Sequence, residues 1–162
     1  MSLAAQILDL AKQSETMITT AESCTGGMVM AALTDIAGSS AVAERGFVTY
    51  TNNAKMQMLG VSGATLDAHG AVSEEIAAEM AKGALRNSEA TLSVSITGIA
   101  GPGGSDHKPE GRVCFGIADN KNCATETVEF GALGRSNVRE AARDHALQML
   151  LDRLIQNSSI NR

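Results

Sequence analysis

The sequence predicts an α/β fold, a three-layer α/β/α sandwich around a mixed sheet of about five strands. The first observation behind this prediction is that strand-like stretches are separated by stretches with helical periodicity. The second is that alanine and glycine form about a quarter of the 162 residues, which favours close packing of helices on a sheet. The third is the balance of 44% hydrophobic and 19% charged residues, which is sufficient for a buried core. We therefore expect a single domain over residues 1–162.

Residues 1–60 alternate between helical and extended patterns. The stretch from Phe47 to Tyr50 is aromatic and β-branched throughout, which favours a strand. Gly38 and Gly60 follow helical segments and are typical of helix ends. In chain order, we expect a helix with Leu3, Ile7, Leu10 and Ala11 on one face, a strand at 17–21, a helix at 28–35 closed by Gly38, a strand at 41–51, and a short helix that Asn52 or Asn53 caps and Gly60 ends.

The rest of the chain continues this alternation. Ser73 is a favoured N-cap, and Glu74 and Glu75 suit the positive end of a helix dipole. Apolar residues at 92, 94 and 96 alternate with polar ones, which indicates a strand. In chain order, we expect a turn or short helix at 65–69, a helix from Ser73 with Ile76, Met80, Ala84 and Leu85 on its apolar face, a strand at 92–97, a glycine-rich loop at 98–111, two strands at 112–118 and 125–130 that turn at 119–121, and a helix at 137–156 with Val138, Ala142, Leu147, Leu150, Leu151 and Leu154 inward.

Composition and charge argue against several classes of protein. A net charge of −5 and few aromatic side chains do not suit nucleic-acid binding, so we expect no nucleic-acid partner. The longest wholly apolar run, residues 28–33, is too short for a membrane span, and the first residues lack the pattern of a signal peptide. The three cysteines lack C-x-x-C spacing, which disfavours a disulfide framework or structural zinc. We therefore expect a reduced, cytoplasmic protein without a membrane partner.

The histidines give no sign of a metal site. His69, His107 and His145 are dispersed, with no spacing that is typical of metal ligands. We therefore expect neither a metal nor a cofactor.

The first candidate site is the run Ser-Cys-Thr-Gly-Gly at 23–27, between a predicted strand and a predicted helix. Such a turn exposes backbone N–H groups, and Gly26 and Gly27 let the backbone approach a ligand closely. Ser23 or Thr25 serves either as a nucleophile or as a helix cap, and this motif alone leaves both open. Cys24 competes as nucleophile because a helix N-terminus lowers a thiol pKa; its alternative role is that of a small buried hydrophobe.

The second candidate site combines Tyr50 at a strand end with Lys55 on the following helix. Lysine acts as a general base when burial or a nearby cation lowers its pKa. A serine–lysine pair with Ser23 is then a nucleophile activated without histidine. The alternatives are a solvated lysine on a helix face and an ordinary half-buried strand tyrosine.

The third candidate site is the run Thr-Gly-Ile-Ala-Gly-Pro-Gly-Gly at 97–104. Four glycines directly after a buried strand indicate a loop whose backbone contacts a ligand, although a flexible surface turn is the alternative. In α/β sheets, ligands bind at the carboxyl ends of the strands. All three candidate segments lie at predicted strand ends, so we expect them to share one site.

Together these segments resemble the C-terminal domain of the competence-damage-inducible CinA family, which includes stand-alone nicotinamide-nucleotide amidases. The resemblance spans nearly the whole chain, and its motifs occur in the family order. The matching stretches are TAESCTGG at 20–27, RGFVTY at 45–50, NAK at 53–55, HGAVSEE at 69–75, TGIAGPGG at 97–104, and Lys108-Pro109 with Gly111. The chain has no room for the extra N-terminal domain of larger members, so it is similar to the single-domain form.

The resemblance implies hydrolysis of the carboxamide of nicotinamide mononucleotide, a small-molecule nucleotide, to nicotinate mononucleotide and ammonia in pyridine nucleotide salvage. The catalytic serine of the family falls on Ser23 and its lysine on Lys55. Tyr50 and Thr97 match the accompanying hydroxyl residues, which orient the lysine or relay its proton. We expect the oxyanion site at the backbone N–H groups of residues 25–27, that is Thr25, Gly26 and Gly27.

The same resemblance suggests where the nucleotide binds. We expect contacts from the glycine loop, with Gly98, Gly101, Gly103 and Gly104, and from Arg139 toward the phosphate. Family members often have an acidic residue where this chain has Gly134, which weakens the phosphate assignment. Glu110 replaces a residue that is more often apolar, with no consequence that follows from the sequence.

Two rival functions fit part of the pattern. A non-catalytic nucleotide- or partner-binding module needs the glycine loops but not Ser23 together with Lys55. A cysteine hydrolase uses Cys24 instead of Ser23. The alanine- and methionine-rich composition is also compatible with a homo-oligomer, which the sequence neither requires nor excludes.

Overall fold

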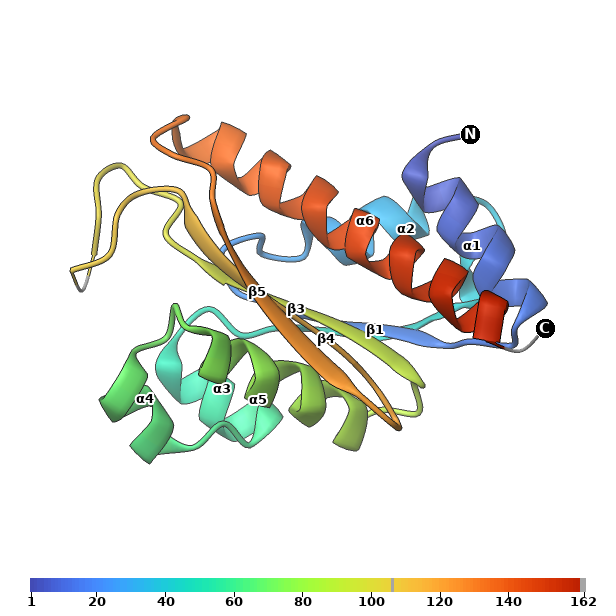
Figure 1. Ribbon diagram of the computed structural model, residues 1–162, viewed down its shortest axis with the longest axis horizontal. Coiled ribbons are helices and arrows are strands. Elements are labelled where there is room, and N and C mark those ends of the chain that lie inside the picture. The colour runs from blue at the N-terminus through green and yellow to red at the C-terminus, as the bar shows by residue number, and fades with distance from the viewer. Residues whose placement is uncertain (106, 161–162) are drawn as a thin grey trace.

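The computed structural model describes residues 1–105 and 107–160, which form one five-stranded sheet with helices on both faces (Figure 1). This arrangement confirms the predicted three-layer α/β/α sandwich. The strands are β1 (Ile18–Glu22), β2 (Ala43–Val48), β3 (Leu92–Gly98), β4 (Arg112–Asp119) and β5 (Cys123–Glu129). The helices are α1 (Leu3–Gln13), α2 (Met28–Thr34), α3 (Asn52–Leu59), α4 (Gly63–His69), α5 (Glu74–Arg86) and α6 (Arg135–Ile160), with a 3₁₀ turn, η1, at Ser39–Ala41.

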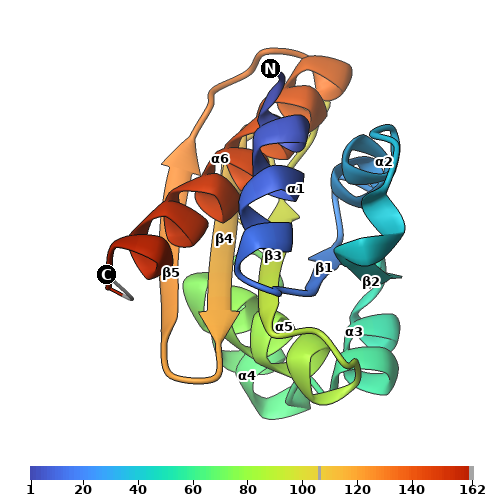
Figure 2. The same ribbon diagram turned by 90° about the vertical axis from the view of Figure 1, so that its right-hand side faces the viewer.

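The sheet is mixed, and its strand order is β2-β1-β3-β4-β5 (Figure 2). Strand β1 pairs in parallel with β2 and β3, whereas β3, β4 and β5 pair antiparallel. The last residue of β1, Glu22, pairs with Val48 on one side and Ile96 on the other. The carboxyl ends of β1, β2 and β3 therefore meet at one edge of the sheet, where ligands bind in open α/β sheets.

The helices divide between the two faces. Helices α1, α2 and α6 cover one face, and α3, α4 and α5 cover the other (Figure 1). The larger core lies under α1 and α6, and all six residues predicted for the inner face of the last helix are buried there. Among the described residues, no helix is both long enough and apolar enough to cross a membrane.

Strand β3 is buried on both faces, although its sequence alternates between apolar and polar residues. Its polar side faces helix α5 instead of water. Ser93 Oγ donates to the Ala81 carbonyl at 2.9 Å, and Ser95 Oγ donates to the Ala77 carbonyl at 2.6 Å. Small hydroxyl residues thus let α5 approach the sheet closely while their polar groups remain hydrogen-bonded.

Glycine serves the same close packing between helices. A Cβ on Gly83 of α5 would lie 2.0 Å from the carbonyl oxygen of Leu59 in α3, a distance that no side chain allows. Glycine at position 83 is therefore required for the backbones of α3 and α5 to approach this closely.

Several element boundaries differ from the sequence-based expectation. The strand expected at 41–51 is shorter at both ends. Residues 39–41 form a 3₁₀ turn before β2, and β2 ends at Val48, so Tyr50 lies in the loop beyond the strand. Thr51, and neither asparagine, caps α3, since its extended backbone lets Oγ1 accept from the Ala54 N–H at 3.1 Å. Helix α2 ends before Gly38, which instead starts the 3₁₀ turn with φ of +85°. Helix α6 is longer than predicted at both ends.

Candidate active site

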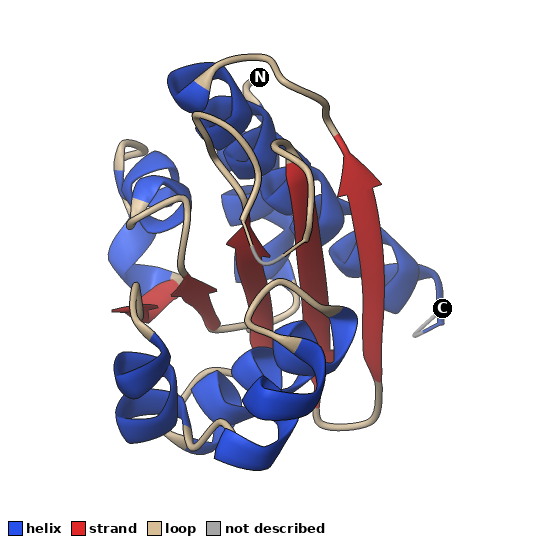
Figure 3. Cartoon of the chain, turned by 90° about the vertical axis from the view of Figure 1, so that its left-hand side faces the viewer, coloured by secondary structure: helices blue, strands red, loops and turns tan. Residues whose placement is uncertain are grey.

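A cavity of about 350 Å³ lies at the carboxyl edge of β1, β2 and β3. The loops at this edge of the sheet face the viewer in Figure 3. The segments that line it come from distant parts of the chain: the turn after β1, the loop after β2, helix α3, the segment between α4 and α5, the end of β3 with the loop after it, and the start of α6. Eight of the twelve residues expected to act in catalysis or substrate binding line this cavity: Ser23, Tyr50, Lys55, Thr97, Gly98, Gly101, Gly103 and Gly104.

Ser23 is placed by the turn that joins β1 to α2. Its backbone N–H donates to the carbonyl of Ile96 on the neighbouring strand at 2.9 Å, which anchors the start of the turn. Gly26 and Gly27 then take φ values of +58° and +105°, so the chain reverses within a few residues. The side chain of Ser23 is left at the cavity wall.

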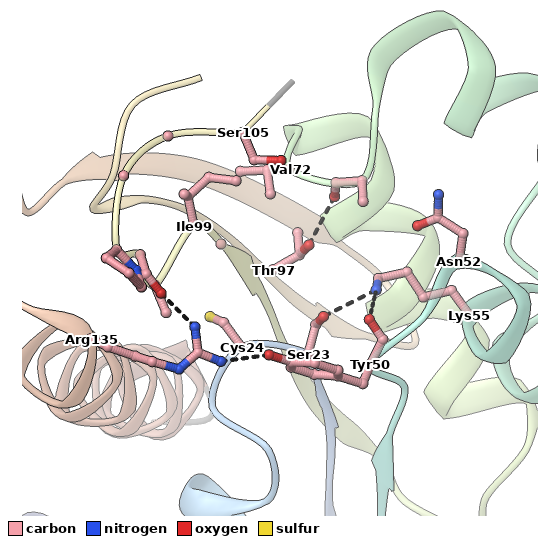
Figure 4. Close-up of a pocket in the computed structure, with 17 residues that line it drawn as sticks. Ser23, Cys24, Tyr50, Asn52, Lys55, Val72, Thr97, Ile99, Ser105 and Arg135 are labelled. Carbon is pink, nitrogen blue, oxygen red and sulfur yellow. Dashed lines mark hydrogen bonds between the residues drawn. The ribbon is translucent and has the colours of Figure 1, made fainter. Parts of the chain in front are cut away.

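Lys55 reaches Ser23 from helix α3 (Figure 4). Its side chain is only 1% exposed, and Nζ lies 3.0 Å from Ser23 Oγ. Nζ also donates to the carbonyls of Thr49 at 2.9 Å and Tyr50 at 3.3 Å. Burial lowers the pKa of Lys55 to about 8, because an ammonium group is poorly solvated there. A neutral amine has two N–H bonds and one lone pair, so with both carbonyls occupied the lone pair is directed at the serine hydroxyl.

Cys24 also lines the cavity but is not activated. Its side chain is 5% exposed, and burial raises the pKa of the thiol to about 12. The lowered pKa expected from a helix N-terminus is therefore wrong for this residue. The residue's own backbone and the charges of Arg139 and Lys55 lower the pKa, and the carboxylate of Glu22 raises it, but burial is the largest effect. A thiol protonated at neutral pH is a poor nucleophile.

Tyr50 contacts Lys55 through its backbone and not through its side chain. The ring is exposed, and the hydroxyl accepts a hydrogen bond from Arg135 at 2.7 Å (Figure 4). Arg135 also donates to the carbonyl of Gly101, so its guanidinium joins the loops that follow β2 and β3. The orienting contact with the lysine, which the resemblance assigned to the hydroxyl of Tyr50, is made by the carbonyl.

Thr97 holds one wall of the cavity. Its buried hydroxyl donates to the carbonyl of Ala71 at 2.8 Å, in the segment between α4 and α5 (Figure 4). Lys108 donates to the carbonyls of His69, at 2.7 Å, and Val72 in the same segment. Thr97 at the end of β3 and Lys108 in the glycine loop therefore both hold the segment between α4 and α5 by hydrogen bonds.

The glycine loop is held in place by its own contacts. Gly101 and Gly103 have φ values of +89° and +79°, which disfavour other residues. The Gly103 N–H donates to the carboxylate of Glu110 at 2.7 Å, and a Cβ on Gly104 would lie 2.4 Å from the Lys108 carbonyl oxygen. Glu110, which had no evident consequence in the sequence, thus fixes the loop that lines the cavity.

The structure places four of the expected binding residues outside the cavity lining: Thr25, Gly26, Gly27 and Arg139. The Gly26 N–H donates to the carbonyl of Ser23 at 3.0 Å, and the Gly27 N–H donates to the carboxylate of Glu22 at 3.1 Å. The expectation that these two N–H groups form an oxyanion site is therefore wrong, because both are already used.

Arg139 supports the serine turn from outside the cavity. Its Nε donates to the carbonyl of Cys24 at 2.9 Å, and its terminal nitrogen donates to the carbonyl of Thr25 at 3.3 Å. Arg139 does not line the cavity, which removes the support for it as a phosphate ligand. Arg135, one helical turn earlier, lines the cavity instead.

Sequence reasoning missed a role for Glu22. This residue is 1% exposed, and its carboxylate accepts hydrogen bonds from the turn that follows Ser23. The available signal was an acidic residue at the end of a strand whose residues are otherwise apolar or hydroxyl-bearing.

Within residues 1–105 and 107–160, no three or more histidine, cysteine or acidic side chains are grouped to hold a metal ion. The fold and the site define an α/β protein with a buried serine–lysine pair at the carboxyl edge of its sheet. A family model described as the CinA C-terminal domain matches residues 1–154. The chain belongs to this family.

Individual relatives agree with this assignment over nearly their whole length. The chain is 50% identical over 159 residues to a protein from Escherichia coli named nicotinamide-nucleotide amidohydrolase PncC, covering 98% of this chain and 96% of that one. Its structure is similar to that of the competence/damage inducible protein CihA from Agrobacterium tumefaciens, with a TM-score of 0.90, 49% identity, and coverage of 93% and 92%. A CinA superfamily protein from Klebsiella pneumoniae gives a TM-score of 0.91 at 34% identity, with coverage of 95% and 96%.

Proposed function

We propose that the chain hydrolyses the carboxamide of nicotinamide mononucleotide to nicotinate mononucleotide and ammonia. Support comes from the Escherichia coli relative named for this activity, which is 50% identical along almost the entire chain. The chain is thus an amidohydrolase that acts on a small-molecule nucleotide. Nicotinate mononucleotide is a precursor of NAD, so the reaction belongs to pyridine nucleotide salvage.

The observation that carries the mechanism is the 3.0 Å contact between Ser23 Oγ and Lys55 Nζ. Neutral Lys55 takes the hydroxyl proton as Ser23 attacks the carboxamide carbon, which forms a tetrahedral oxyanion. When the oxyanion collapses, the carbon–nitrogen bond breaks, and the Lys55 ammonium returns the proton to the leaving nitrogen. Ammonia leaves, and the nicotinate acyl group remains as an ester on Ser23.

The second half of the reaction uses the same pair. Water enters where ammonia left, and Lys55 takes one of its protons during attack on the ester carbon. The new intermediate collapses by breaking the bond to Ser23 Oγ, which takes the proton back from Lys55. Serine and neutral lysine are thereby regenerated.

The oxyanion needs hydrogen-bond donors that the fold leaves unused. Among the described residues, the backbone N–H groups of Cys24 and Thr25 form no hydrogen bond, in contrast to those of Gly26 and Gly27. Cys24 directly follows the nucleophile and lines the cavity. We assign its N–H as the oxyanion donor.

The remaining lining residues suit a nucleotide. The cavity volume of about 350 Å³ lies in the range that is typical of small-molecule sites. Among the described residues, Arg135 is the cation on its lining besides Lys55, and we assign it to the substrate phosphate. Its two terminal nitrogens each donate one hydrogen bond, to Gly101 and to Tyr50, and each keeps a second N–H for a phosphate oxygen. Gly98, Gly101, Gly103 and Gly104 contribute backbone to the wall of the cavity.

The direct test is ammonia release from nicotinamide mononucleotide by the purified protein, with nicotinate mononucleotide identified by chromatography. We expect stoichiometric formation of both products. Binding of the nucleotide in calorimetry without ammonia release would contradict the proposal and favour the non-catalytic binding module.

A further inference from the structure

We propose that Glu22 is a positioning residue for the nucleophile: its buried carboxylate holds the turn that carries Ser23 in the geometry needed for attack. This role rests on the proposed amidase function. Glu22 does not line the cavity, so it acts through the residues around it.

The carboxylate of Glu22 collects five hydrogen bonds. Oε1 accepts from Thr25 Oγ1 at 2.7 Å, from the Gly27 N–H at 3.1 Å and from the Val29 N–H at 3.0 Å. Oε2 accepts from the Met30 N–H at 3.1 Å and from Thr20 Oγ1 at 3.2 Å. These donors come from both sides of Ser23 in the sequence, so one side chain closes the whole turn around the nucleophile.

These contacts also replace the missing cap of α2. The residue at the N-cap position, Gly27, has no side chain to accept the first N–H groups of the helix. The carboxylate of Glu22 accepts three of them, and its negative charge lies at the positive end of the helix dipole. A buried carboxylate is expensive unless it is fully hydrogen-bonded, and these five donors meet that requirement.

The backbone of Glu22 links the nucleophile to the base. Its carbonyl accepts from the Thr49 N–H at 2.8 Å, and the carbonyl of Thr49 accepts from Lys55 Nζ at 2.9 Å. Glu22 therefore controls the Ser23 turn through its side chain and contacts the segment that holds Lys55 through its main chain. A shift of this residue changes the distance between Ser23 Oγ and Lys55 Nζ.

The principal test is Glu22→Gln, which keeps the shape but directs an amide NH₂ at groups that are themselves donors. Because Glu22 touches no substrate, we expect kcat for ammonia release from nicotinamide mononucleotide to fall by about 100-fold, as for a misplaced reacting group, with KM within about threefold of wild type. Ser93→Ala is the matched control. It removes a buried hydrogen bond to α5, so it lowers stability while leaving kcat unchanged. A kcat for folded Glu22→Gln equal to that of wild type would overturn the proposal.

A second pair of variants covers the case in which Glu22→Gln does not fold. Thr25→Val removes the 2.7 Å donor to Glu22 but keeps the volume, and Thr25→Ser keeps the donor. We expect Thr25→Val to lower kcat about tenfold and Thr25→Ser to restore most of it. Equal kcat values for the two variants would contradict a role of the Glu22 contacts in positioning Ser23.

A readout without substrate separates this inference from the proposed function. Cys24 lies in the same turn and is buried, so loosening of the turn exposes its thiol. We expect iodoacetamide to label Cys24 about tenfold faster in Glu22→Gln, or in Thr25→Val, than in wild type or Ser93→Ala, as measured by peptide mass spectrometry. Unchanged labelling in both variants would overturn the positioning role. Faster labelling in the two variants, together with a wild-type protein that releases no ammonia, would reject only the amidase function.

Discussion

Lys55 Nζ and Ser23 Oγ, 32 residues apart in the sequence, lie 3.0 Å apart in a buried environment. The carbonyls of Thr49 and Tyr50 fix the amine from the other side. Removal of either reacting group, or a change in the protonation of the amine, therefore has distinct consequences.

The first prediction separates the serine from the neighbouring cysteine. Ser23→Ala removes the nucleophile and leaves only uncatalysed hydrolysis, so we expect no measurable ammonia release. Cys24→Ala keeps most of the activity, because burial raises the pKa of that thiol to about 12 and its side chain takes no part. Full activity in Ser23→Ala, or complete loss in Cys24→Ala with Ser23 intact, would reject Ser23 as nucleophile.

The second prediction concerns the pH dependence of activity. Because burial lowers the pKa of Lys55 to about 8, we expect kcat/KM to rise about tenfold per pH unit below this value and to level off above it. Lys55→Met should be nearly inactive at every pH while keeping the wild-type circular dichroism spectrum. A kcat/KM for wild type that is flat from about pH 6 to about pH 9 would argue against lysine as the base.

The third prediction concerns the pH dependence of stability. The pKa of Lys55 is about 8 in the folded protein, against 10.5 for an unperturbed lysine in the unfolded chain, so between these pH values the unfolded chain binds more protons. The contribution of Lys55 to the free energy of unfolding therefore rises with pH across this window. Below about pH 8 both states are protonated, and the full cost of burying the ammonium is present.

The measurement is a comparison with a variant that lacks the titrating group. We expect the difference in free energy of unfolding, wild type minus Lys55→Met, to increase from about pH 7 to about pH 10 in urea titrations. A difference independent of pH would show that the lysine is not perturbed by burial.

The fourth prediction tests which part of Tyr50 matters. Tyr50→Phe keeps the carbonyl that holds Lys55 but loses the hydroxyl that accepts from Arg135. We expect kcat to stay within about threefold of wild type and KM to rise about fivefold, the effect of one lost hydrogen bond at the cavity mouth. A loss of kcat as severe as in Lys55→Met would favour proton relay through the hydroxyl instead.

The fifth prediction concerns the close contact between α3 and α5. A Cβ on Gly83 would lie 2.0 Å from the Leu59 carbonyl oxygen, so the two helices must separate in Gly83→Ala. We expect a loss of about 1–3 kcal/mol in the free energy of unfolding, seen as a lower Tm. Lys82→Ala, at an exposed neighbouring position on α5, is the control and should leave Tm nearly unchanged. Equal Tm values for both variants would contradict the packing argument.

Local patterns allowed much of the fold to be predicted. Helix caps, helix ends and strand alternation depend on interactions between residues close in the sequence, so they follow from the sequence. Examples are the N-cap Ser73, the helix end at Gly60 and the alternation in β3. Boundaries that depend on pairing partners were less accurate. The end of β2 before Tyr50 and the length of α6 are examples, because neighbouring strands and the core decide them.

The candidate site divides in the same way. From the sequence it was possible to predict the turn that carries Ser23 between a strand and a helix, the glycine loop after β3, and, through the family resemblance, the role of Lys55. The positions of the two arginines follow from the folded structure, in which Arg135 lines the cavity while Arg139 supports the serine turn. The two arginines lie one turn apart on the same helix, so their spacing in the sequence does not show which of them reaches the cavity. That depends on which loops from distant segments pack beside each arginine.

The chemistry of the pair was likewise a matter of tertiary structure. Whether a lysine is a solvated cation or a base with a pKa near 8 depends on burial and on carbonyls from another segment. Whether the amides of α2 bind an oxyanion depends on Glu22, which already uses them. Both outcomes are set by desolvation and by which donors and acceptors have been matched, and these quantities exist only once the chain has folded.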